Sequence, residues 1–483
     1  MSKINLKEKL MEYFGFDSFM IGQEETIETI LSGQDTLSVL PTGTGKSLCY
    51  QLAGYLMNGT TVIVSPLLSL IQDQVSQFNF RGNGTAIGLT SILSYSEKKY
   101  VLKNIQSYKF VYLSPEMLSQ FEVINALKQI DVSLFVVDEA HCISTWGPDF
   151  RPDYLDLNNA IVKLGTPCVL ALTATATLNI QNDIMTQLKT EGRDFHKIIK
   201  SVNRSNIFLS VLKVHDESDK NKQLLNLLNK IKGVGIVYFS SKKKANEVSD
   251  LINNNTGLRS EPYHADLNDM ARYTVQRQFM ENQIDVICAT SAFGMGINKK
   301  DIRYVIHYHM PADFESYVQE FGRSGRDGQQ SIAIVFSQEN DVFLQRNLID
   351  LTIPDDDFIR MYFKKHKELV GLGEEKGKLL DYYYEKQSSV EEVQFLFRQR
   401  KIEKETGLQN MIMFVNSSNC RKQQILNHFG ESKLIEHDEF CCSALFNVDV
   451  LQKIGLEKKI IKNDDKQLIQ STDNIISRLF KLS

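Results

Sequence analysis

Cysteine is scarce in this sequence, and long apolar runs are missing. Seven cysteines among 483 residues are too few and too scattered for the disulfide framework of a secreted protein. Four of them lie in motifs or apolar segments and are expected to be reduced core thiols: Cys49, Cys142, Cys168 and Cys288. No apolar run is long enough to span a bilayer, and residues 1–9 carry charge without the apolar core of an export signal. These absences predict a cytoplasmic protein with no membrane segment.

A strong charge of one sign is missing as well. The 55 lysines and arginines nearly balance the 59 aspartates and glutamates, which leaves a formal net charge of −4. Nucleic acid, if bound, would therefore lie in local basic grooves, because the molecule has no global positive field. The composition, 42% hydrophobic and 24% charged, is that of a folded protein, and the length predicts two or three domains.

A glycine-bearing segment, residues 41–47, joins a predicted buried strand at 36–40 to a predicted helix at 48–53. This context is typical of a phosphate-binding loop, whose glycines let backbone N–H groups surround phosphate oxygens. Lys46 would reach the β- and γ-phosphates, and the Ser47 hydroxyl would ligate Mg²⁺. The alternative is a glycine turn without a ligand. The predicted nucleotide-binding residues of this loop are Thr42, Gly43, Thr44, Gly45, Lys46 and Ser47.

Gln23 lies a short distance before this loop in the sequence. Its side-chain amide offers a donor and an acceptor, which suits the recognition of adenine. A glutamine at this spacing can equally cap a helix or lie on the surface. The spacing alone leaves the two interpretations open.

Two adjacent carboxylates, Asp138 and Glu139, follow the apolar run at 134–137. Asp138 would hold Mg²⁺ directly or through water, and Glu139 would orient and deprotonate the attacking water. An acidic pair at a strand end is common by chance. Its combination with a phosphate-binding loop upstream predicts phosphoryl transfer.

Three hydroxyl residues at the ends of predicted strands are candidate nucleic-acid contacts. Ser65 and Ser114 each precede a proline, and Thr290 ends the strand predicted at 285–290. Ligands of parallel sheets bind at the carboxyl ends of the strands, and short polar loops there suit backbone phosphates. An ordinary strand end is the alternative for each of them.

An aromatic loop, residues 142–154, directly follows the acidic pair and contains the only tryptophan. Its aromatic side chains, interleaved with an arginine, suit stacking on unpaired bases. The alternative is a loop whose aromatic residues fold back into the core. The candidate DNA-binding residues of the loop are Trp146, Phe150 and Arg151.

The segment 319–326 places Arg323 and Arg326 three residues apart, on what should be one helical face. Paired arginines can neutralise the charge of a transferring γ-phosphoryl group. A surface helix that makes ion pairs is the alternative. Gln319 opens the segment and is counted among the candidate catalytic residues.

In this order the motifs resemble those of superfamily 2 helicases, and in detail those of the RecQ family of ATP-dependent DNA helicases. Four stretches carry the resemblance: 41–50, 138–151, 289–298 and 319–328. The resemblance is strong over residues 5–340 and weak to about residue 430. It implies an α/β protein with two tandem RecA-like domains, each a doubly wound parallel sheet. ATP would bind between the domains, and single-stranded DNA would lie across them.

The resemblance also assigns roles to residues. Closure of the cleft on ATP would bring Arg323 and Arg326 to the phosphates bound at Lys46, and Gln23 would contact adenine. The implied activity is 3′-to-5′ translocation on single-stranded DNA with unwinding of duplex DNA, in DNA repair or recombination. One alternative is a DNA-stimulated ATPase that remodels or anneals nucleic acid with little unwinding. An RNA helicase is a second alternative, which the aromatic loop disfavours.

Beyond residue 338 the predicted strands fade and charged helices follow. This region resembles the zinc-binding helical subdomain of the family, and its candidate ligands are Cys420, His437, Cys441 and Cys442. Zinc prefers four nitrogen or sulfur ligands, but two adjacent cysteines are an awkward pair. Two interpretations stay open: a bound zinc ion, or reduced cysteines in a packed helical hairpin. The residues after Cys442 are too few for a winged helix and a further DNA-binding domain, as in a short, bacterial-type form.

The sequence therefore predicts four parts. They are a first helicase domain at 1–200, a second at 201–338, a helical subdomain at 339–445 and a tail at 446–483. The expected cofactors are ATP and Mg²⁺. The expected partners are single-stranded and duplex DNA, together with single-strand-binding or recombination proteins. The protein is expected to be a monomer.

Overall fold

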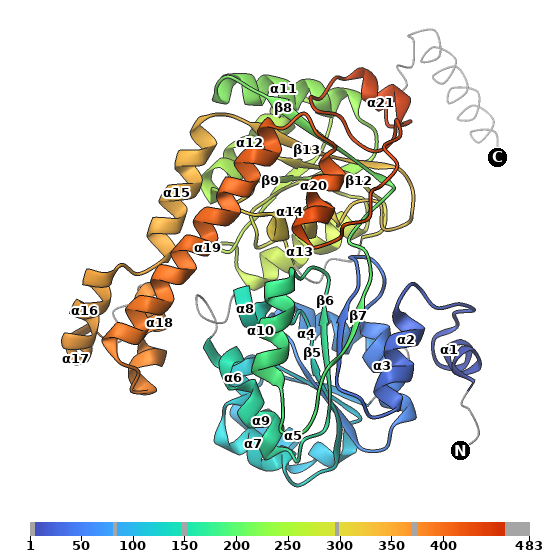
Figure 1. The fold of residues 1–483 in the computed structure, drawn as a ribbon. Helices are drawn as coiled ribbons and strands as arrows, with labels where there is room; N and C mark the ends of the chain where they lie inside the picture. The colour runs from blue at the N-terminus through green and yellow to red at the C-terminus, as the bar shows by residue number, and fades with distance from the viewer. Residues whose placement is uncertain (1–4, 81–84, 146–151, 295–298, 370–374, 459–483) are drawn as a thin grey trace, which may run out of the picture.

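The structure is a computed structural model that describes residues 5–80, 85–145, 152–294, 299–369 and 375–458. Figure 1 shows two α/β units, one above the other, joined by the stretch between β7 and β8. The C-terminal helices lie on the upper unit, and α16–α18 project to one side of it. Among the described residues, no helix is both long and apolar enough to cross a membrane.

The first unit is built on a seven-stranded sheet in the order β3-β4-β2-β5-β6-β1-β7, with parallel pairings. Its strands are β1 Thr36–Val39, β2 Thr60–Val64, β3 Ala86–Leu89, β4 Phe110–Leu113, β5 Val132–Val137, β6 Cys168–Thr173 and β7 His196–Ile199. Its helices are α1 Leu6–Phe14, α2 Gln23–Leu31, α3 Ser47–Leu56, α4 Leu68–Phe80, α5 Tyr95–Lys103, α6 Pro115–Leu118, α7 Phe121–Leu127, α8 Cys142–Thr145, α9 Leu157–Lys163 and α10 Leu178–Leu188.

Helices cover both faces of this sheet, which explains why its central strands β2, β4, β5 and β6 are buried along almost their whole length. Along β5, Phe135 and Val137 enter the core beneath α7, α9 and α10. Leu134 and Val136, which alternate with them, enter the core beneath α2 and α3. The loops at the carboxyl ends of β1 and β5 are thereby held on a rigid platform.

The second unit has a six-stranded sheet in the order β10-β11-β9-β12-β13-β8, again with parallel pairings. Its strands are β8 Ile207–Lys213, β9 Val234–Tyr238, β10 Ser260–Tyr263, β11 Val286–Ala289, β12 Ile302–His307 and β13 Ser331–Ser337. Its helices are α11 Glu217–Lys230, α12 Lys242–Asn255, α13 Asp269–Met280 and α14 Phe314–Phe321.

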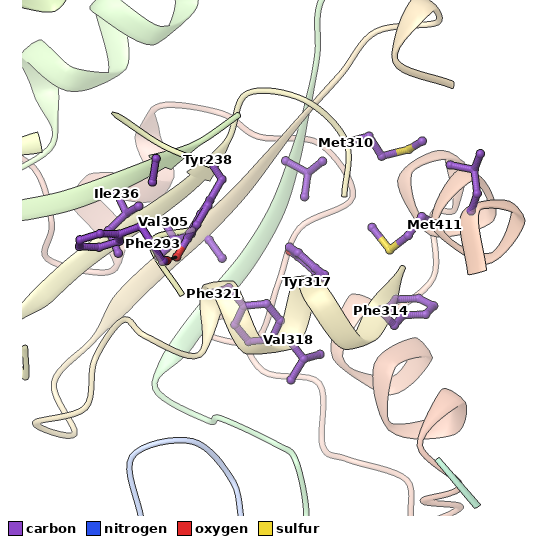
Figure 2. Close-up of a cluster of buried hydrophobic side chains, with 14 of the residues drawn as sticks. Ile236, Tyr238, Phe293, Val305, Met310, Phe314, Tyr317, Val318, Phe321 and Met411 are labelled. Atoms are coloured by element: carbon purple, nitrogen blue, oxygen red, sulfur yellow. Dashed lines mark hydrogen bonds between the residues drawn. The ribbon is translucent and has the colours of Figure 1, made fainter. Parts of the chain in front are cut away.

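The C-terminal region is helical and shares a core with the second sheet. Its helices are α15 Asn340–Thr352, α16 Asp356–Lys364, α17 His366–Leu369, α18 Glu375–Glu385, α19 Val390–Asn416, α20 Arg421–His428 and α21 Asp449–Lys453. Figure 2 shows Phe314 and Tyr317 of α14 in one cluster with Met411 of α19 and strand residues such as Ile236. The predicted fold class, two RecA-like parallel-sheet units followed by a helical region, is confirmed.

The segment after α20 runs along the edge strand β8. The backbone N–H of Leu209 donates to the Cys441 carbonyl at 3.3 Å, and that of Ser443 donates to the Leu209 carbonyl at 3.0 Å. Phe446 N–H then donates to the Val211 carbonyl at 2.7 Å. These bonds cover an edge that would otherwise expose unpaired backbone groups.

Candidate active site

The predicted phosphate-binding loop connects the end of β1 to the first turn of α3. Gly43 and Gly45 have φ angles of 87° and 65°, in the left-handed region that glycine adopts readily. The Thr44 hydroxyl donates to the Pro41 carbonyl at 2.8 Å and tightens the turn. Lys46 directly precedes α3, which begins at Ser47. The loop thus presents backbone amides and a cation at a helix N-terminus, an arrangement that favours an anion.

Gln23, the first residue of α2, is buried against this loop. Its Nε2 donates to the carbonyls of Thr44 and Gly45 at 2.7 and 3.1 Å, and its Oε1 accepts the N–H of Met20 at 2.9 Å. Both ends of the amide therefore bind the protein and support the loop. Its contact with adenine stays a prediction.

The pKa values of the two predicted acids, at the end of β5, are shifted in opposite directions. Burial, together with the neighbouring Glu139, raises the pKa of Asp138 to about 7 although Lys46 opposes this shift. Burial would raise the pKa of Glu139 too, but Lys46 and two arginines hold it below its usual value. Glu139 also has a φ of 50°, rare for a residue with a side chain, so the local structure dictates its orientation. Glu139 is thus the acid that stays ionised.

His141 connects Glu139 to the second unit. Its Nδ1 lies 2.9 Å from the Thr173 hydroxyl and 3.5 Å from Glu139 Oε2, and its Nε2 lies 3.1 Å from Gln319 Nε2. An amide nitrogen can only donate, so with this amide orientation His141 Nε2 accepts and Nδ1 carries the proton. Burial lowers the pKa of His141, which agrees with a neutral ring. Gln319 also donates to the Thr175 hydroxyl at 3.3 Å.

The arginine-bearing segment of the second unit lies directly on the phosphate-binding loop. The Thr42 hydroxyl donates to the Gly322 carbonyl at 3.1 Å. A Cβ at Gly322 would lie 2.4 Å from the Thr42 oxygen, so this approach requires glycine. Arg326 Cγ lies 3.3 Å from the position that a Cβ at Gly43 would take.

Arg323 and Arg326 form a concentrated positive charge beside the acids. Burial, with the nearby charges of Arg323 and Arg204, lowers the pKa of Arg326 to about 9. Both arginines also hold down the pKa of Glu139. The structure therefore brings together the six residues predicted to be catalytic: Lys46, Asp138, Glu139, Gln319, Arg323 and Arg326.

The six candidate DNA-binding residues lie in different environments, and the structure describes only three of them. Ser65 is buried after β2, and the Ser114 hydroxyl accepts the Met117 N–H at 3.3 Å as the cap of α6. Thr290 is half-buried after β11, and its N–H donates to the Tyr263 carbonyl at 3.0 Å. Three further candidates lie outside the described residues: Trp146, Phe150 and Arg151. Contact of these residues with DNA stays a prediction.

The four predicted zinc ligands converge, with ligand atoms that all lie within 4.8 Å of one another. Cys420 Sγ is 3.6 Å from Cys441 Sγ and 3.7 Å from Cys442 Sγ, which in turn is 3.8 Å from His437 Nδ1. Thiolates about 2.3 Å from a tetrahedral zinc ion are about 3.8 Å apart, so the arrangement fits zinc. Hydrogen bonds from the Cys441 thiol and from backbone N–H groups lower the pKa of Cys442 to about 5. The adjacent cysteines both reach Cys420, 3.7 Å from each other.

Sequence reasoning missed Arg204, in the stretch between β7 and β8. Its NH1 donates to the Thr42 carbonyl at 3.1 Å and to the Gly322 carbonyl at 2.9 Å, so it touches both units. The only available signal was a lone arginine in the polar run 203–206 between two apolar segments. His141, named only as part of a motif, likewise acquires its contacts through the fold.

Three family models match this chain. The model described as DEAD/DEAH box helicase matches residues 21–184, and the one described as helicase conserved C-terminal domain matches residues 219–328. The model described as RecQ zinc-binding matches residues 386–444, which include the four converging ligands.

Curated relatives agree with these matches. The probable ATP-dependent DNA helicase RecS of Bacillus subtilis is 40% identical over 494 residues, covering 99% of this chain and 98% of that protein. The ATP-dependent DNA helicase RecQ of Bacillus subtilis is 38% identical over 345 residues, covering 71% of this chain and 57% of that protein. The chain thus matches the first along its whole length and the second over little more than half.

Solved structures with the same fold include two helicase complexes. DEAD-box helicase Mss116 bound to single-stranded RNA and UDP-BeF superposes with a TM-score of 0.61, at 15% identity, covering 84% of this chain and 90% of that one. S. cerevisiae Dbp5 bound to RNA and ADP BeF3 has a TM-score of 0.56 at 18% identity, covering 72% and 90%. At such low identity these likenesses show the fold alone.

Proposed function

Since this chain belongs to the RecQ family of superfamily 2 helicases and is an ATP-dependent DNA helicase, we propose that it moves 3′ to 5′ along single-stranded DNA and unwinds the duplex ahead of it. The contact between the arginine-bearing segment and the phosphate-binding loop carries the proposal, because it lets the state of the nucleotide control the cleft between the two units. DNA repair or recombination is the proposed setting.

The hydrolytic step is assigned to residues at this contact. Lys46 and the loop amides bind the β- and γ-phosphates, and Glu139, ionised because of its lowered pKa, accepts a proton from the attacking water. Arg323 and Arg326 stabilise the charge that develops on the γ-phosphoryl group. Ser47 and Asp138 would hold Mg²⁺, which neutralises phosphate charge when bound.

Gln319 is proposed to couple ATP hydrolysis to the movement of the two units. His141 lies beside Glu139 in the first unit and contacts Gln319 on α14 of the second. Loss of the γ-phosphate removes the partner of the two arginines, so ATP and ADP favour different cleft openings. Repeated closing and opening then moves the DNA strand.

The same proposal includes a structural zinc ion held by Cys420, His437, Cys441 and Cys442. The ligand atoms of these four residues all lie within 4.8 Å of one another. It places the domain boundaries after residues 200, 338 and 445, and treats the protein as a monomer. The four cysteines outside the cluster are buried thiols, which supports a reducing compartment such as the cytoplasm. Single-strand-binding or recombination proteins are the proposed protein partners.

A strand-displacement assay tests this function. Duplexes with a 3′ tail, a 5′ tail or blunt ends are mixed with protein and ATP, and Lys46→Ala serves as the inactive control. We expect displacement of the 3′-tailed duplex only. Displacement from the 5′ tail would reverse the direction, and ATP turnover without displacement would instead support a remodelling or annealing factor. ATPase stimulation by RNA but not by DNA would indicate an RNA helicase.

A further inference from the structure

Arg204 binds the two halves of the nucleotide cleft with one side chain. Its NH1 donates to the carbonyl and hydroxyl oxygens of Thr42 at 3.1 and 3.2 Å, and to the Gly322 carbonyl at 2.9 Å. Its NH2 donates to the carbonyls of Ser324 and Gly325 at 3.0 and 2.8 Å. One guanidinium therefore joins the phosphate-binding loop to the segment that carries Arg323 and Arg326.

The chemistry of these contacts requires arginine. The acceptors are neutral oxygens, four of them backbone carbonyls, so none of them is a titrating partner. Burial lowers the pKa of Arg204, but a guanidinium stays charged at any ordinary pH. Its rigid planar fork reaches acceptors on two sides at once, whereas a lysine ammonium is a point donor on a flexible stem. Because both terminal nitrogens are occupied by protein oxygens, Arg204 does not itself need a phosphate.

Asn206 holds the same turn from the same stretch of chain. Its Nδ2 donates to the carbonyls of Gly325 and Gln329 at 2.7 and 2.9 Å. A Cβ at Gly325 would lie 2.5 Å from that nitrogen, and the Gly325 φ is 57°, so glycine is required there. The turn that presents the arginines is thus shaped by residues outside it.

The C-terminal region anchors this stretch on both sides of Arg204. Lys422 Nζ donates to the Ser205 carbonyl at 3.0 Å, and Glu431 Oε1 accepts the Val202 N–H at 2.8 Å. Lys422 lies in the first turn of α20, directly after the candidate zinc ligand Cys420, and Glu431 follows the end of that helix. The guanidinium is therefore held at a defined place rather than on a loose linker.

We propose that Arg204 is a positioning residue that fixes the arginine-bearing turn against the phosphate-binding loop and so aims Arg323 and Arg326 at the γ-phosphate. The inference rests on the proposed role of these two arginines. Their like charges repel each other, so the turn needs hydrogen bonds from outside it to keep both arginines at one place. Burial, with the charges of Arg323 and Arg204, accordingly lowers the pKa of Arg326. Without Arg204, ATP still binds the loop, but Arg323 and Arg326 of the second unit are no longer held in the position from which they reach the γ-phosphate.

The test compares Arg204→Gln and Arg204→Lys with Arg193→Gln. Arg193 is the control, because it also donates to backbone carbonyls, those of Thr166, Pro167 and Gly33. These bonds, and its ion pair with Asp35 at 2.8 Å, lie within the first unit. We expect Arg204→Gln to lower kcat for ATP at least about tenfold while KM changes less than about threefold. Arg204→Lys should fail to restore kcat although it keeps the charge. Arg193→Gln should lower the Tm and leave kcat unchanged.

A double-mutant cycle with Arg326→Ala completes the test. If Arg204 acts by positioning Arg323 and Arg326, the double variant loses less kcat than the product of the two single losses, because one of the two positioned groups is already gone. Multiplicative losses, a rise in KM with unchanged kcat, or rescue by Arg204→Lys would each overturn the proposal. The readout is ATP hydrolysis, so a failure to displace DNA does not affect it. Full kcat in Arg326→Ala would refute the assigned role of that arginine, and with it the premise of the inference.

Discussion

The nucleotide cleft and the cysteine cluster are both sites of converging side chains, but they are assembled in opposite ways. The cleft joins segments of two units, and the hydrogen bond from Thr42 to Gly322 spans 280 positions of the sequence. The ligands Cys420 and Cys442 are only 22 positions apart, on one unit. The cleft can therefore open while each unit stays folded, whereas the cluster can open only if the local fold is lost.

The two sites also differ in what their environments do to stability. In the cleft, burial raises the pKa of Asp138, so the ionised form that would hold a cation destabilises the folded state. In the cluster, a bound zinc ion would supply folding free energy directly. We therefore expect cleft variants to change catalysis without loss of stability, and cluster variants to do the reverse.

The largest expected effect is that of Lys46→Ala. The variant loses the cation at the N-terminus of α3 that we propose to bind the phosphates, so ATP turnover should fall by about 100-fold or more. Steady-state hydrolysis with saturating single-stranded DNA measures this loss, and thermal unfolding should show an unchanged Tm. Turnover at the wild-type rate would mean that this loop is not the nucleotide site.

Asp138→Asn should separate catalysis from stability. Folded Asp138 holds its proton to about pH 7, whereas the unfolded aspartate releases it near pH 3.8. The folded state binds more protons between these values, so stability falls as pH rises through this window. The variant should lose ATP turnover yet have a Tm higher than wild type by about 2–4 °C at pH 8, with a smaller gain at pH 5. A lower Tm at pH 8 would contradict this account.

Cys442→Ser tests whether the cysteine cluster contributes to stability rather than to catalysis. We expect the purified wild type to contain one zinc ion per chain by elemental analysis, and the variant to lose it together with about 5 °C or more of Tm. Its ATP turnover at low temperature should fall far less than that of Lys46→Ala. Cys288→Ser, a buried cysteine of β11 outside the cluster, should keep the metal. Equal metal content in all three proteins would exclude a zinc site at this cluster.

Gln23→Ala should give the smallest effect and sharpen the description of the cleft. Its amide supports the carbonyls of Thr44 and Gly45, so its loss should raise KM for ATP about tenfold with little change in kcat. A parallel measurement with GTP separates the two roles. An equal rise in KM for ATP and GTP would indicate that Gln23 only supports the loop. A loss of the preference for ATP over GTP would indicate that Gln23 contacts the base.

Many strands of this fold could be predicted from local sequence patterns, and those that were not predicted are instructive. The strands β1, β2 and β5 are apolar runs at the predicted places, because both faces of a parallel sheet are buried. The edge strand β7 was not predicted, since only Ile198 of its four residues is buried. β13 is also absent from the predicted strands, although its sequence carries the same apolar signal.

The residues of the site divide in the same way. Lys46, Asp138 and Glu139 could be predicted from the sequence, because each belongs to a short motif of neighbouring residues that indicates its chemistry. The contact of His141 with Gln319, and every contact of Arg204, depend on how two separately folded units meet. No spacing in the sequence encodes that meeting, which is why Arg204 was missed.

The helix α19 extends from the core of the second sheet to the helices that project beside it. It is 27 residues long, which is about 40 Å, and its C-terminal half is packed into the core of the second sheet through Met411 and Phe414. Its other half carries α16 and α18, with which it shares the same core (Figure 1). A rotation of the second unit by about 10° would therefore sweep the far end of α19 through about 7 Å. If the proposed closure of the cleft rotates the second unit, the helix would act as a lever that converts a change on the scale of one phosphate group into a displacement on the scale of a nucleotide.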